Sequence, residues 1–459
     1  MTDSLSRSLA RFVAGLKYEA TPPAVIDKMK ASLVHGLVMA FVGAKNHHCA
    51  ATIELALKEE GRADGATILT HGGKASRYGA AMANSSLLHA QNQSDTYHML
   101  AHPGACVIPA VLATAELDGA SGRDALMGLV AGYEVECRLA GDFLPSTQAR
   151  GFRSSPVYGT FGAAVGASKT RGLDENGVHS AICWASTFTA GLSEGSHAFH
   201  EPFAARNGLL ASVVAAGGEF PGSERSLDGP GGFYNAFTGN NEGRLSYAFY
   251  GSRQIDLQEV VADLGKRWEL MHIIPKMPPT PGFNIPIIEL LKDLKRQHNF
   301  QGDDVQSMQV FMNWLETSYP SPALVDAEPG KPPRTGGTNY VAAYLCYHDD
   351  FPVMGISPNH ASTEDQRVRD LTNRVEVLGV WDRLPFAPRI SLRMRNGSLI
   401  EGEFEPKALE WDFETELKNL RPVFDLIDWP RDNLEDIVEA VSKLEVLPSV
   451  RPLLALCVP

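Results

Sequence analysis

The sequence contains little cysteine and no paired cysteine motif. Six cysteines are scattered over 459 residues, without a CxxC pair. They are Cys49, Cys106, Cys137, Cys183, Cys346 and Cys457. This spacing disfavours a disulfide framework and a cysteine-based zinc site, and we expect reduced, mostly buried thiols. Each cysteine stands in an apolar run, where burial raises the pKa of the thiol, so a cysteine nucleophile is disfavoured as well.

Basic residues are fewer than acidic ones. The chain has 41 Lys and Arg against 54 Asp and Glu, a net charge of −13 at pH 7, and it contains no basic run. Such a chain is a poor partner for nucleic acid and for anionic membranes. If its substrate is an anion, the positive charge that binds it must be gathered locally in a pocket.

Long apolar runs and the common nucleotide motifs are missing too. No stretch approaches the roughly 18 consecutive apolar residues of a bilayer span, and the N-terminal MTDSLSRSLARFVAGL is too polar for a signal peptide. We therefore expect a soluble, cytoplasmic protein. The absence of a strand-linked GxGxxG and of GxxxxGK[ST] disfavours dinucleotide and P-loop sites. The GLSEG at 191–195 follows helical sequence instead of a strand, which disfavours a serine-hydrolase elbow.

Helical periodicity dominates the first 220 or so residues. After Pro22 and Pro23, the apolar residues of AVIDKMKASLVHGLVMAFVGA recur at intervals of three and four. Ser121 and Asp124 have the spacing of a helix-capping box. The segments 157–171 and 203–218 are rich in Ala and Gly, which lets helix backbones approach closely, so we expect buried, mutually packed helices there.

The pattern changes after about residue 265. Residues 305–315 and 373–380 are rich in β-forming side chains, and in 388–405 an alternating run turns at Asn396-Gly397, the favoured hairpin dipeptide. Residues 351–366 lack periodicity and suggest a mobile loop, whereas 430–446 returns to helix. The sequence thus predicts a mainly α fold. It consists of a helical domain at 1–265, an α+β domain at 266–405 and a closing segment at 406–459 that returns to the helical domain.

Polar residues gather in four segments. The segments are HAQNQSDTYHMLAHPG at 89–104, ARGFRSSPVYGTFG at 149–162, GSHAFHEPFAARNG at 195–208 and IIPKMPPTPGFN at 273–284. Within the first, Asp95, His98 and His102 could be imagined as metal ligands. Pro103 follows directly and no recognisable ligand spacing appears, so we expect no metal. The purely structural alternative is that Asp95 caps the helix that begins near Pro103.

The run from AAMANSSLLHAQNQSDTYHMLAHPG onward resembles the signature of the MmgE/PrpD family. The resemblance continues, in order, through GYEVECRLA, GFRSSPVYGTFGAAVGASK, GLSEGSHAFHEPFAARNGLLAS, IIPKMPPTPG and TNYVAAYL, and so spans most of the chain. The family includes 2-methylcitrate dehydratase, cis-aconitate decarboxylase and iminodisuccinate epimerase. The resemblance implies a large all-helical domain with a smaller α+β lid domain, a homodimer, and catalysis without a metal or organic cofactor.

The resemblance also implies site residues. The matching positions are Asp95, Thr96, His102, His200, Lys276 and Tyr340. Four positions depart from the family pattern. Asn92 replaces an acidic residue, Arg153 and Pro281 replace histidines, and His197 replaces a lysine. We therefore expect a substrate different from those of the best-known members, with a different reaction as a further alternative.

The family reactions share the removal or delivery of a proton on a carbon beside a carboxylate or imine. A carbanion formed there is stabilised by nearby cations, for which Arg and Lys are suited. We expect His102 or His98 to be the base, with Asp95 orienting an imidazole. Tyr340 or His200 would be the acid. The expected substrate-binding residues are Lys276, Arg153, Arg206, His197, Asn92 and Thr96, although Arg206 could equally form an ion pair within the helical domain.

These residues predict a cofactor-independent enzyme acting on a small di- or tricarboxylic acid. A hydro-lyase of the 2-methylcitrate dehydratase type is the first expectation. An epimerase or isomerase is the alternative, since Arg153 removes one proton donor and adds a carboxylate clamp. A third alternative is a non-catalytic, carboxylate-binding family member.

Overall fold

A computed structural model describes residues 3–90, 92–195, 197–319, 337–354 and 365–459. The chain divides into two compact units, which are described separately. The first unit contains residues 1–246, 254–275 and 411–459, and the second contains 247–253 and 276–410. We placed the first boundary at 265 and the last at 405. The short segment 247–253 goes with the second unit because the Asn313 side chain donates to the Phe249 carbonyl there (2.6 Å).

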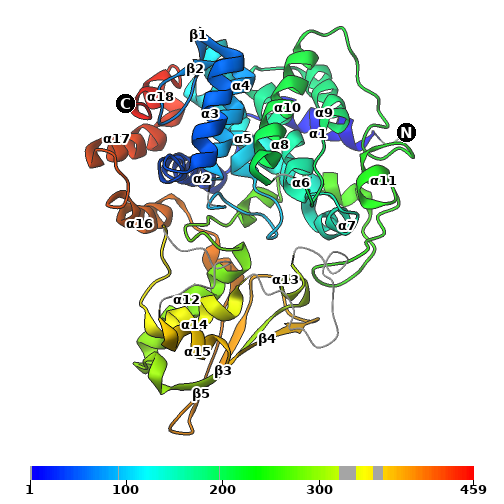
Figure 1. The fold of residues 1–459 in the computed structure, drawn as a ribbon. Coiled ribbons are helices and arrows are strands. Elements are labelled where there is room, and N and C mark those ends of the chain that lie inside the picture. Colours follow the sequence, from blue (N-terminus) through cyan, green and yellow to red (C-terminus); the bar gives the residue numbers. More distant parts are fainter. Residues whose placement is uncertain (1–2, 91, 196, 320–336, 355–364) are drawn as a thin grey trace. The chain divides into compact units, whose positions relative to one another are not determined.

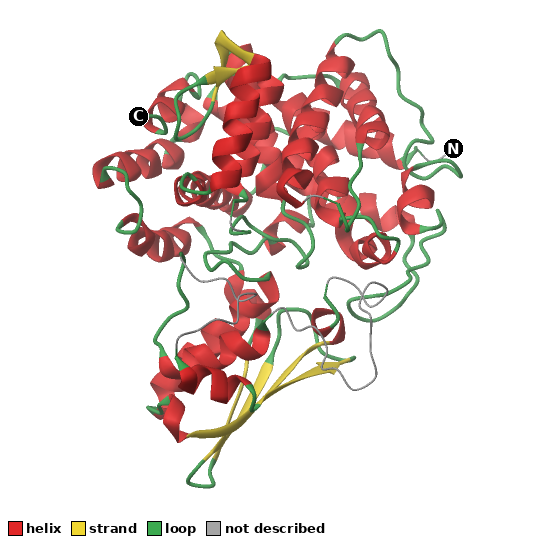
Figure 2. Ribbon diagram, viewed as in Figure 1, coloured by secondary structure: helices red, strands yellow, loops and turns green. Residues whose placement is uncertain are grey.

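The first unit is built almost entirely of helices (Figures 1 and 2). Its helices are α1 (Leu5–Gly15), α2 (Pro23–Gly43), α3 (His47–Glu60), α4 (Arg77–Leu88), α5 (Pro103–Asp118), α6 (Gly122–Ala140), α7 (Leu144–Ala149), α8 (Ser154–Thr170), α9 (Glu175–Phe188), α10 (His200–Ala216), α11 (Phe233–Thr238), α16 (Phe413–Phe424), α17 (Arg431–Ser442) and α18 (Arg451–Leu456). The predicted helices after Pro23, over the two Ala/Gly-rich segments and in the tail are thereby confirmed.

Small residues let the central helices α5, α6, α8 and α10 pack closely. A Cβ on Gly208 of α10 would lie 2.4 Å from the Thr160 carbonyl oxygen of α8, and one on Gly132 of α6 would lie 2.7 Å from the Gly162 carbonyl oxygen. The predicted capping box is also present, since Ser121 and Asp124 bond each other's backbone amides at the start of α6.

The expectation of an all-helical first domain is wrong in one detail. Strands β1 (Gly61–Thr67) and β2 (Lys74–Ala75) form a small antiparallel pair after α3. The two strands approach so closely at Gly65 that a Cβ there would lie 2.0 Å from the Ala75 carbonyl oxygen. The strand was not predicted because Gly65 and its neighbours do not form an alternating pattern of apolar and polar side chains.

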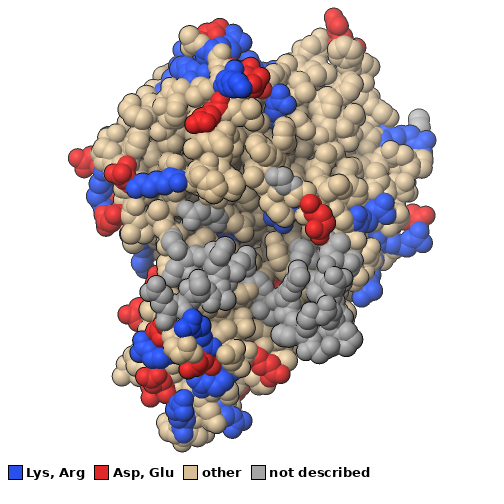
Figure 3. Space-filling view, viewed as in Figure 1, with Lys and Arg blue, Asp and Glu red and all other residues tan. Residues whose placement is uncertain are grey.

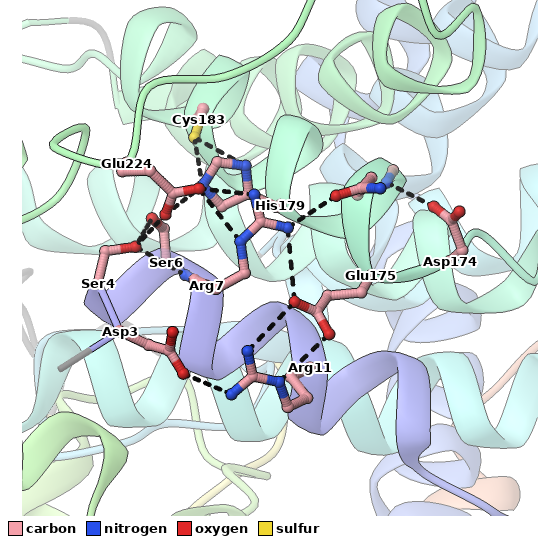
Figure 4. A network of polar contacts seen from close by, with 12 residues as sticks. Asp3, Ser4, Ser6, Arg7, Arg11, Asp174, Glu175, His179, Cys183 and Glu224 are labelled. Atoms are coloured by element: carbon pink, nitrogen blue, oxygen red, sulfur yellow. Dashed lines mark hydrogen bonds and ion pairs between the residues drawn. The ribbon is translucent and has the colours of Figure 1, made fainter. Parts of the chain in front are cut away.

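A polar network fastens α1 to α9 (Figure 4). Arg7 pairs with Glu224 (2.6 Å) and Arg11 with Glu175 (3.3 Å). Beside them, Cys183 Sγ lies 3.7 Å from His179 Nε2. All six cysteines fall within the described residues and are free and buried, as expected. Burial raises the pKa of the Cys183 thiol, and that of Cys49 to about 11, so neither is a ready thiolate.

The second unit is a four-stranded sheet with helices. Its strands are β3 (Val305–Asn313), β4 (Val375–Val380), β5 (Arg389–Met394) and β6 (Leu399–Glu403), in the order β4-β3-β5-β6. Its helices are α12 (Ile285–His298), α13 (Trp314–Thr317), α14 (Thr338–Tyr347) and α15 (Gln366–Thr372). The β3–β4 pair is parallel and the others are antiparallel. The hairpin predicted at Asn396-Gly397 joins β5 and β6, with Gly397 at φ 87°. Of the loop predicted at 351–366, residues 355–364 lie outside the described residues.

Candidate active site of the first unit

The loop between α4 and α5 carries the first group of predicted site residues. Three of its residues have left-handed backbone angles: Asn92 (φ 60°), His98 (φ 44°) and Met99 (φ 56°). Such conformations cost on the order of 1–3 kcal/mol each outside glycine and collect at functional sites. The loop is fixed by a two-way backbone bridge, in which Thr96 and Ile274 exchange N–H donors (2.8 and 2.9 Å).

A buried ion pair between α2 and α16 supports the same loop. His35 Nδ1 lies 2.8 Å from Glu416 Oε1, and His35 Nε2 lies 2.9 Å from the Gln93 carbonyl oxygen. Both partners offer acceptors, so a doubly protonated imidazolium satisfies them together. Burial opposes this charge, but Glu416 and the Gln93 carbonyl raise the pKa of His35 overall. The loop is thereby tied to α16.

Asp95 is buried and accepts two hydrogen bonds. Its Oδ1 accepts from the Gly104 amide in the first turn of α5 (2.8 Å), and its Oδ2 accepts from the Tyr133 hydroxyl (2.7 Å). A Cβ at residue 104 would lie 2.8 Å from Oδ2, so only glycine fits there. The Asp95 side chain therefore caps the start of α5, which is the structural alternative considered for it. Both oxygens of the Asp95 carboxylate thus accept from α5 and α6, and the expectation that Asp95 orients an imidazole stays a prediction.

His102 is oriented by the main chain instead. Its Nδ1 lies 2.9 Å from the Asp95 backbone oxygen, and its backbone amide donates to Ser155 Oγ of α8 (3.2 Å). A carbonyl can only accept, so Nδ1 carries the hydrogen and Nε2 is the basic nitrogen of the neutral ring. The His102 side chain is only 2% exposed, and its ring lies 4.8 Å from the ring of His89.

His89 and Glu201 connect the loop to α10, and the sequence analysis assigned neither to the site. His89 Nδ1 lies 2.8 Å from Ser94 Oγ, and its Nε2 lies 3.7 Å from Glu201 Oε2. Burial opposes the ionisation of Glu201, but His89, Arg153 and the Glu201 backbone amide lower its pKa overall. A carboxylate directly after the predicted His200, in the first turn of a helix, was the available signal for Glu201.

Arg153, His197 and His200 lie at the starts of α8 and α10, on the Glu201 side of this cluster. Arg153 precedes α8 and is 6% exposed, and its charge lowers the pKa of both histidines, after the larger effect of burial. The two imidazole rings lie 5.1 Å apart, at the start of α10. His200 is buried, whereas His197 is exposed. The predicted residues Asp95, His102, Arg153 and His200 are thus connected through His89 and Glu201.

Unsatisfied polar atoms mark this cluster. Within the described part of the chain, the buried atoms Thr96 Oγ1, His200 Nδ1 and Glu201 Oε1 have no hydrogen-bond partner. Buried polar groups are nearly always bonded, so three such atoms near one loop require an explanation. A polar ligand bound at the cluster would supply the missing partners.

His98 faces a different pocket from His102. It lines a cavity of about 210 Å³ together with Tyr97, Cys137, Asp142 and Glu269. Burial lowers the pKa of His98 to about 4. The expectation that His98 is an alternative base to His102 stays a prediction.

Arg206 and Asn92 were both expected to bind substrate. Arg206 Nη2 pairs with Glu60 Oε1 (3.1 Å), which is the ion-pair alternative considered above. It stands six residues after His200, about 9 Å farther along α10. Asn92 forms a turn with His89 through its backbone amide (2.9 Å) and adopts a left-handed conformation that asparagine tolerates. The substrate-binding role expected of both residues stays a prediction.

Lys276 and Tyr340 belong to the second unit, and both are buried. Tyr340 lies in α14, and its buried hydroxyl has no hydrogen-bond partner among the described residues. Pro281 precedes the short helix Gly282–Asn284 at the start of α12. Because the units are described separately, the meeting of Lys276 and Tyr340 with His102 stays a prediction.

Two further findings concern metals and membranes. Among the described residues, no group of three or more His, Cys, Asp and Glu is arranged to hold a metal ion. No helix in the described ranges is both long and apolar enough to cross a bilayer.

The helical unit and its histidine-lined loop define the class of protein. The MmgE/PrpD N-terminal domain model matches residues 7–246, more than half of the chain. The chain therefore belongs to the MmgE/PrpD family.

Curated relatives agree with this assignment. The chain is 29% identical over 314 residues to the cis-aconitate decarboxylase-like protein oryM of Aspergillus oryzae, covering 64% of this chain and 62% of the relative. It is 27% identical over 310 residues to cis-aconitate decarboxylase of Aspergillus terreus, covering 64% and 61%. It is 27% identical over 292 residues to the Homo sapiens cis-aconitate decarboxylase, covering 58% of each. The chain thus spans about three fifths of the relatives it matches.

Proposed function

We propose that this protein is a lyase that acts on a small di- or tricarboxylic acid by moving a proton at a carbon beside a carboxylate. The observation that carries the proposal is the oriented imidazole of His102, which is linked through His89 to Glu201, whose buried Oε1 has no hydrogen-bond partner among the described residues. Family membership supports an enzyme that acts on carboxylates, and the names of the relatives support a lyase.

His102 is the proposed base. Its Nδ1–H donates to the Asp95 carbonyl, so Nε2 takes the proton from carbon while the electron pair remains on the substrate as a carbanion. Arg153 is the proposed partner for a substrate carboxylate, and Lys276 is proposed to add a second cation. In a protein of net charge −13, a buried arginine near three imidazoles provides the local positive charge that an anion requires.

The leaving group decides the type of lyase. In a hydro-lyase, the carbanion expels a hydroxide from the neighbouring carbon, and Tyr340 or His200 donates the proton that makes it water. In a decarboxylase, the bond between the carboxylate and its neighbouring carbon breaks and CO₂ leaves. The electron pair remains on that neighbouring carbon, which then takes a proton. The names of the relatives favour decarboxylation, and cis-aconitate is therefore the first substrate to test beside citrate and 2-methylcitrate.

Nuclear magnetic resonance in deuterated water tests the proposal. We expect cis-aconitate to lose CO₂ and take up one deuteron at carbon, or a citrate-like acid to lose water together with one carbon-bound proton. Failure to turn over or exchange any di- or tricarboxylic acid would contradict the proposal. Binding without turnover, seen as thermal stabilisation by the same acids, would instead indicate the non-catalytic alternative.

An epimerase is the second candidate, because Arg153 stands where the resemblance places a histidine. A guanidinium can bind a carboxylate but does not deliver a proton near neutral pH. This arrangement favours returning the proton to the same carbon. Deuterium exchange at the α-carbon with no loss of carboxylate or hydroxyl would identify this activity.

We also propose a homodimer formed through the exposed face of α9 and α10. Phe203 (44% exposed), Leu210 (36%) and Phe220 (54%) lie on these helices or directly after α10, and Phe220 packs edge-on against Trp184 of α9. In the view of Figure 3, the surface over these helices is broadly free of charged side chains. A second copy, although also strongly acidic, meets little repulsion there.

Light scattering coupled to size-exclusion chromatography tests the dimer. We expect twice the chain mass for the native protein and a monomer for the double substitution Phe203→Asp and Leu210→Glu. Leu399→Asp, which changes an exposed apolar residue of β6, is the matched control and should remain dimeric. A monomeric native protein, or a dimeric double variant, would refute this interface.

A further inference from the structure

Glu136 is a buried acid to which no role has been given above. It lies in α6 one turn after Tyr133, and its side chain is completely inaccessible to solvent. Within the described part of the chain, neither of its carboxyl oxygens has a hydrogen-bond partner. A carboxyl group of this kind requires an explanation, because it destabilises the folded protein without forming a bond.

Glycines of α8 make the space for this side chain. A Cβ on Gly162 would come within 2.2 Å of Glu136 Oε2, and one on Gly159 would lie 2.4 Å from Cys106 Sγ and 3.7 Å from Glu136 Oε1. The carboxyl group therefore lies between α8 and the start of α5, the helix whose first turn binds Asp95.

The titratable groups that face Glu136 are all acids. Asp95 comes from the loop and Glu201 from α10, and the weak acids are Cys106 of α5 and Tyr133 and Cys137 of α6 itself. Asp95 has two hydrogen-bond donors, and Glu201 has His89 and the charge of Arg153. Burial, followed by Asp95 and Glu201, raises the pKa of Glu136 well above its ordinary value.

We propose that Glu136 is a positioning residue of the candidate site, whose carboxyl group stays protonated beside Asp95 and Glu201 and so limits the negative charge that faces a bound anion. Three carboxyl groups in one dry region do not all ionise together, and the group without donors keeps the proton. Ionised Glu136 would add a third negative charge behind the imidazoles of His89 and His102, and that charge would repel a carboxylate substrate.

The two parts of this proposal rest on different premises. Protonation of Glu136 follows from its surroundings alone, whereas its effect on an anion rests on the proposed function. The tests are chosen so that each part can fail separately.

Infrared spectroscopy tests the protonation. At pH 7 we expect a carbonyl band of a protonated carboxyl group that is absent in Glu136→Gln. The matched control is Glu116→Gln, which changes a buried acid of α5 whose oxygens accept from the Thr67 amide and hydroxyl. Glu116 stands twelve residues after Gly104, about 18 Å away along the helix. Spectra that are identical in the native protein and Glu136→Gln would overturn the proposal.

The pH dependence of unfolding is a second, independent test. An acid whose pKa is raised in the folded protein stabilises the fold at low pH and loses this contribution as pH rises towards the folded pKa. Above pH 5, the unfolding equilibrium of the native protein should therefore shift towards the unfolded state by up to about tenfold per pH unit more than that of Glu136→Gln. Parallel curves would contradict the proposal. Glu136→Met serves as a second variant if the glutamine protein folds poorly.

Calorimetric titration with citrate tests the effect on an anion. At the pH where the infrared band disappears, the dissociation constant of citrate should rise at least tenfold in the native protein and in Glu116→Gln, but not in Glu136→Gln. If the band persists at every pH at which the protein is folded, the affinity for citrate should depend on pH in the same way in the native protein and in Glu136→Gln. Two results would overturn this part of the proposal. One is an equal loss of citrate affinity in the native protein and in Glu136→Gln at a pH where Glu136 is ionised. The other is a loss of citrate affinity in the native protein alone while the infrared band persists. If citrate and the other acids neither bind nor react, the proposed function fails, and the first two tests still decide the protonation.

Discussion

Two helix starts, one in each unit, carry a buried glutamate, and they use it differently. Glu316 at the start of α13 accepts the backbone amides of Asn313 (3.1 Å) and Phe386 (2.8 Å). Glu201 at the start of α10 has His89 at 3.7 Å from Oε2, and its Oε1 has no partner among the described residues. Burial raises the pKa of Glu316 to about 8, whereas the neighbouring cations of Glu201 lower its pKa despite burial.

The difference separates a carboxyl group whose hydrogen bonds are complete from one that has an oxygen left for a ligand. Glu316 contributes to local structure because its partners are fixed amides of its own unit. Glu201 is surrounded by titratable and charged side chains from the loop, α8 and α10, and one of its oxygens remains available. Partners of this kind allow a group to exchange protons and to bind a ligand. The following predictions test this contrast, from the largest expected effect to the smallest.

Replacing His102 should have the largest effect. His102→Ala removes the proposed base, and we expect kcat/KM to fall on the order of 10²–10⁴-fold with little change in the unfolding temperature. The control is His98→Ala, which alters the separate pocket and should reduce activity far less. Equal losses in the two variants would mean that the loop, and not the His102 imidazole, is what catalysis requires.

Replacing Glu201 should alter the pH profile. Glu201 favours the protonated form of His200, so Glu201→Gln should lower the pKa of that imidazole. We expect the alkaline limb of the activity profile, where His200 loses the proton that it donates, to move to lower pH by about one unit, with a smaller loss of kcat than in His102→Ala. An unchanged pH profile would mean that Glu201, like Glu316, contributes only to local structure.

Replacing Glu316 should lower the stability of the fold and leave the pH profile of activity unchanged. Glu316→Gln places an amide N–H₂ against a backbone N–H, and we expect a loss of about 1–3 kcal/mol in the free energy of unfolding. Because the pKa of Glu316 is raised, its contribution to stability is present at low pH and is lost as pH rises towards about 8. Urea unfolding between pH 5 and 9 measures this slope, which should be absent in Glu316→Gln.

Replacing Arg206 should have the smallest effect. Its ion pair with Glu60 is largely at the surface, so Arg206→Met should change the free energy of unfolding by at most about 1 kcal/mol and leave kcat/KM unaltered. A large rise in KM would return Arg206 to the substrate-binding residues, as first expected from the sequence.

Local patterns were sufficient to predict much of the fold. Helix α2 follows its proline pair, α6 begins at the Ser121–Asp124 box, and the β5–β6 hairpin turns at Asn396-Gly397. Each of these is specified by residues a few positions apart. The β1–β2 pair was missed because it depends on a close backbone approach at Gly65, which leaves no alternating pattern of side chains.

The site could be predicted only in part, because its contacts join distant segments. His102 and Arg153 were expected from the resemblance, but the partnership of His89 with Glu201 joins residues more than a hundred positions apart and has no local pattern. Asp95 was expected to act through its carboxylate, yet its main-chain oxygen orients His102. The left-handed backbone of His98 and Met99 could not be predicted either, because neither position is a glycine.

The His35–Glu416 pair has a consequence for the order in which the protein is made. Glu416 is contributed by the final segment of the chain, more than three hundred residues after the loop that it helps to hold. During synthesis the loop emerges early and lacks this anchor until the ribosome has translated most of the message. A product that terminates ahead of Trp411 would therefore contain every histidine of the catalytic cluster but lack the carboxylate that completes its support.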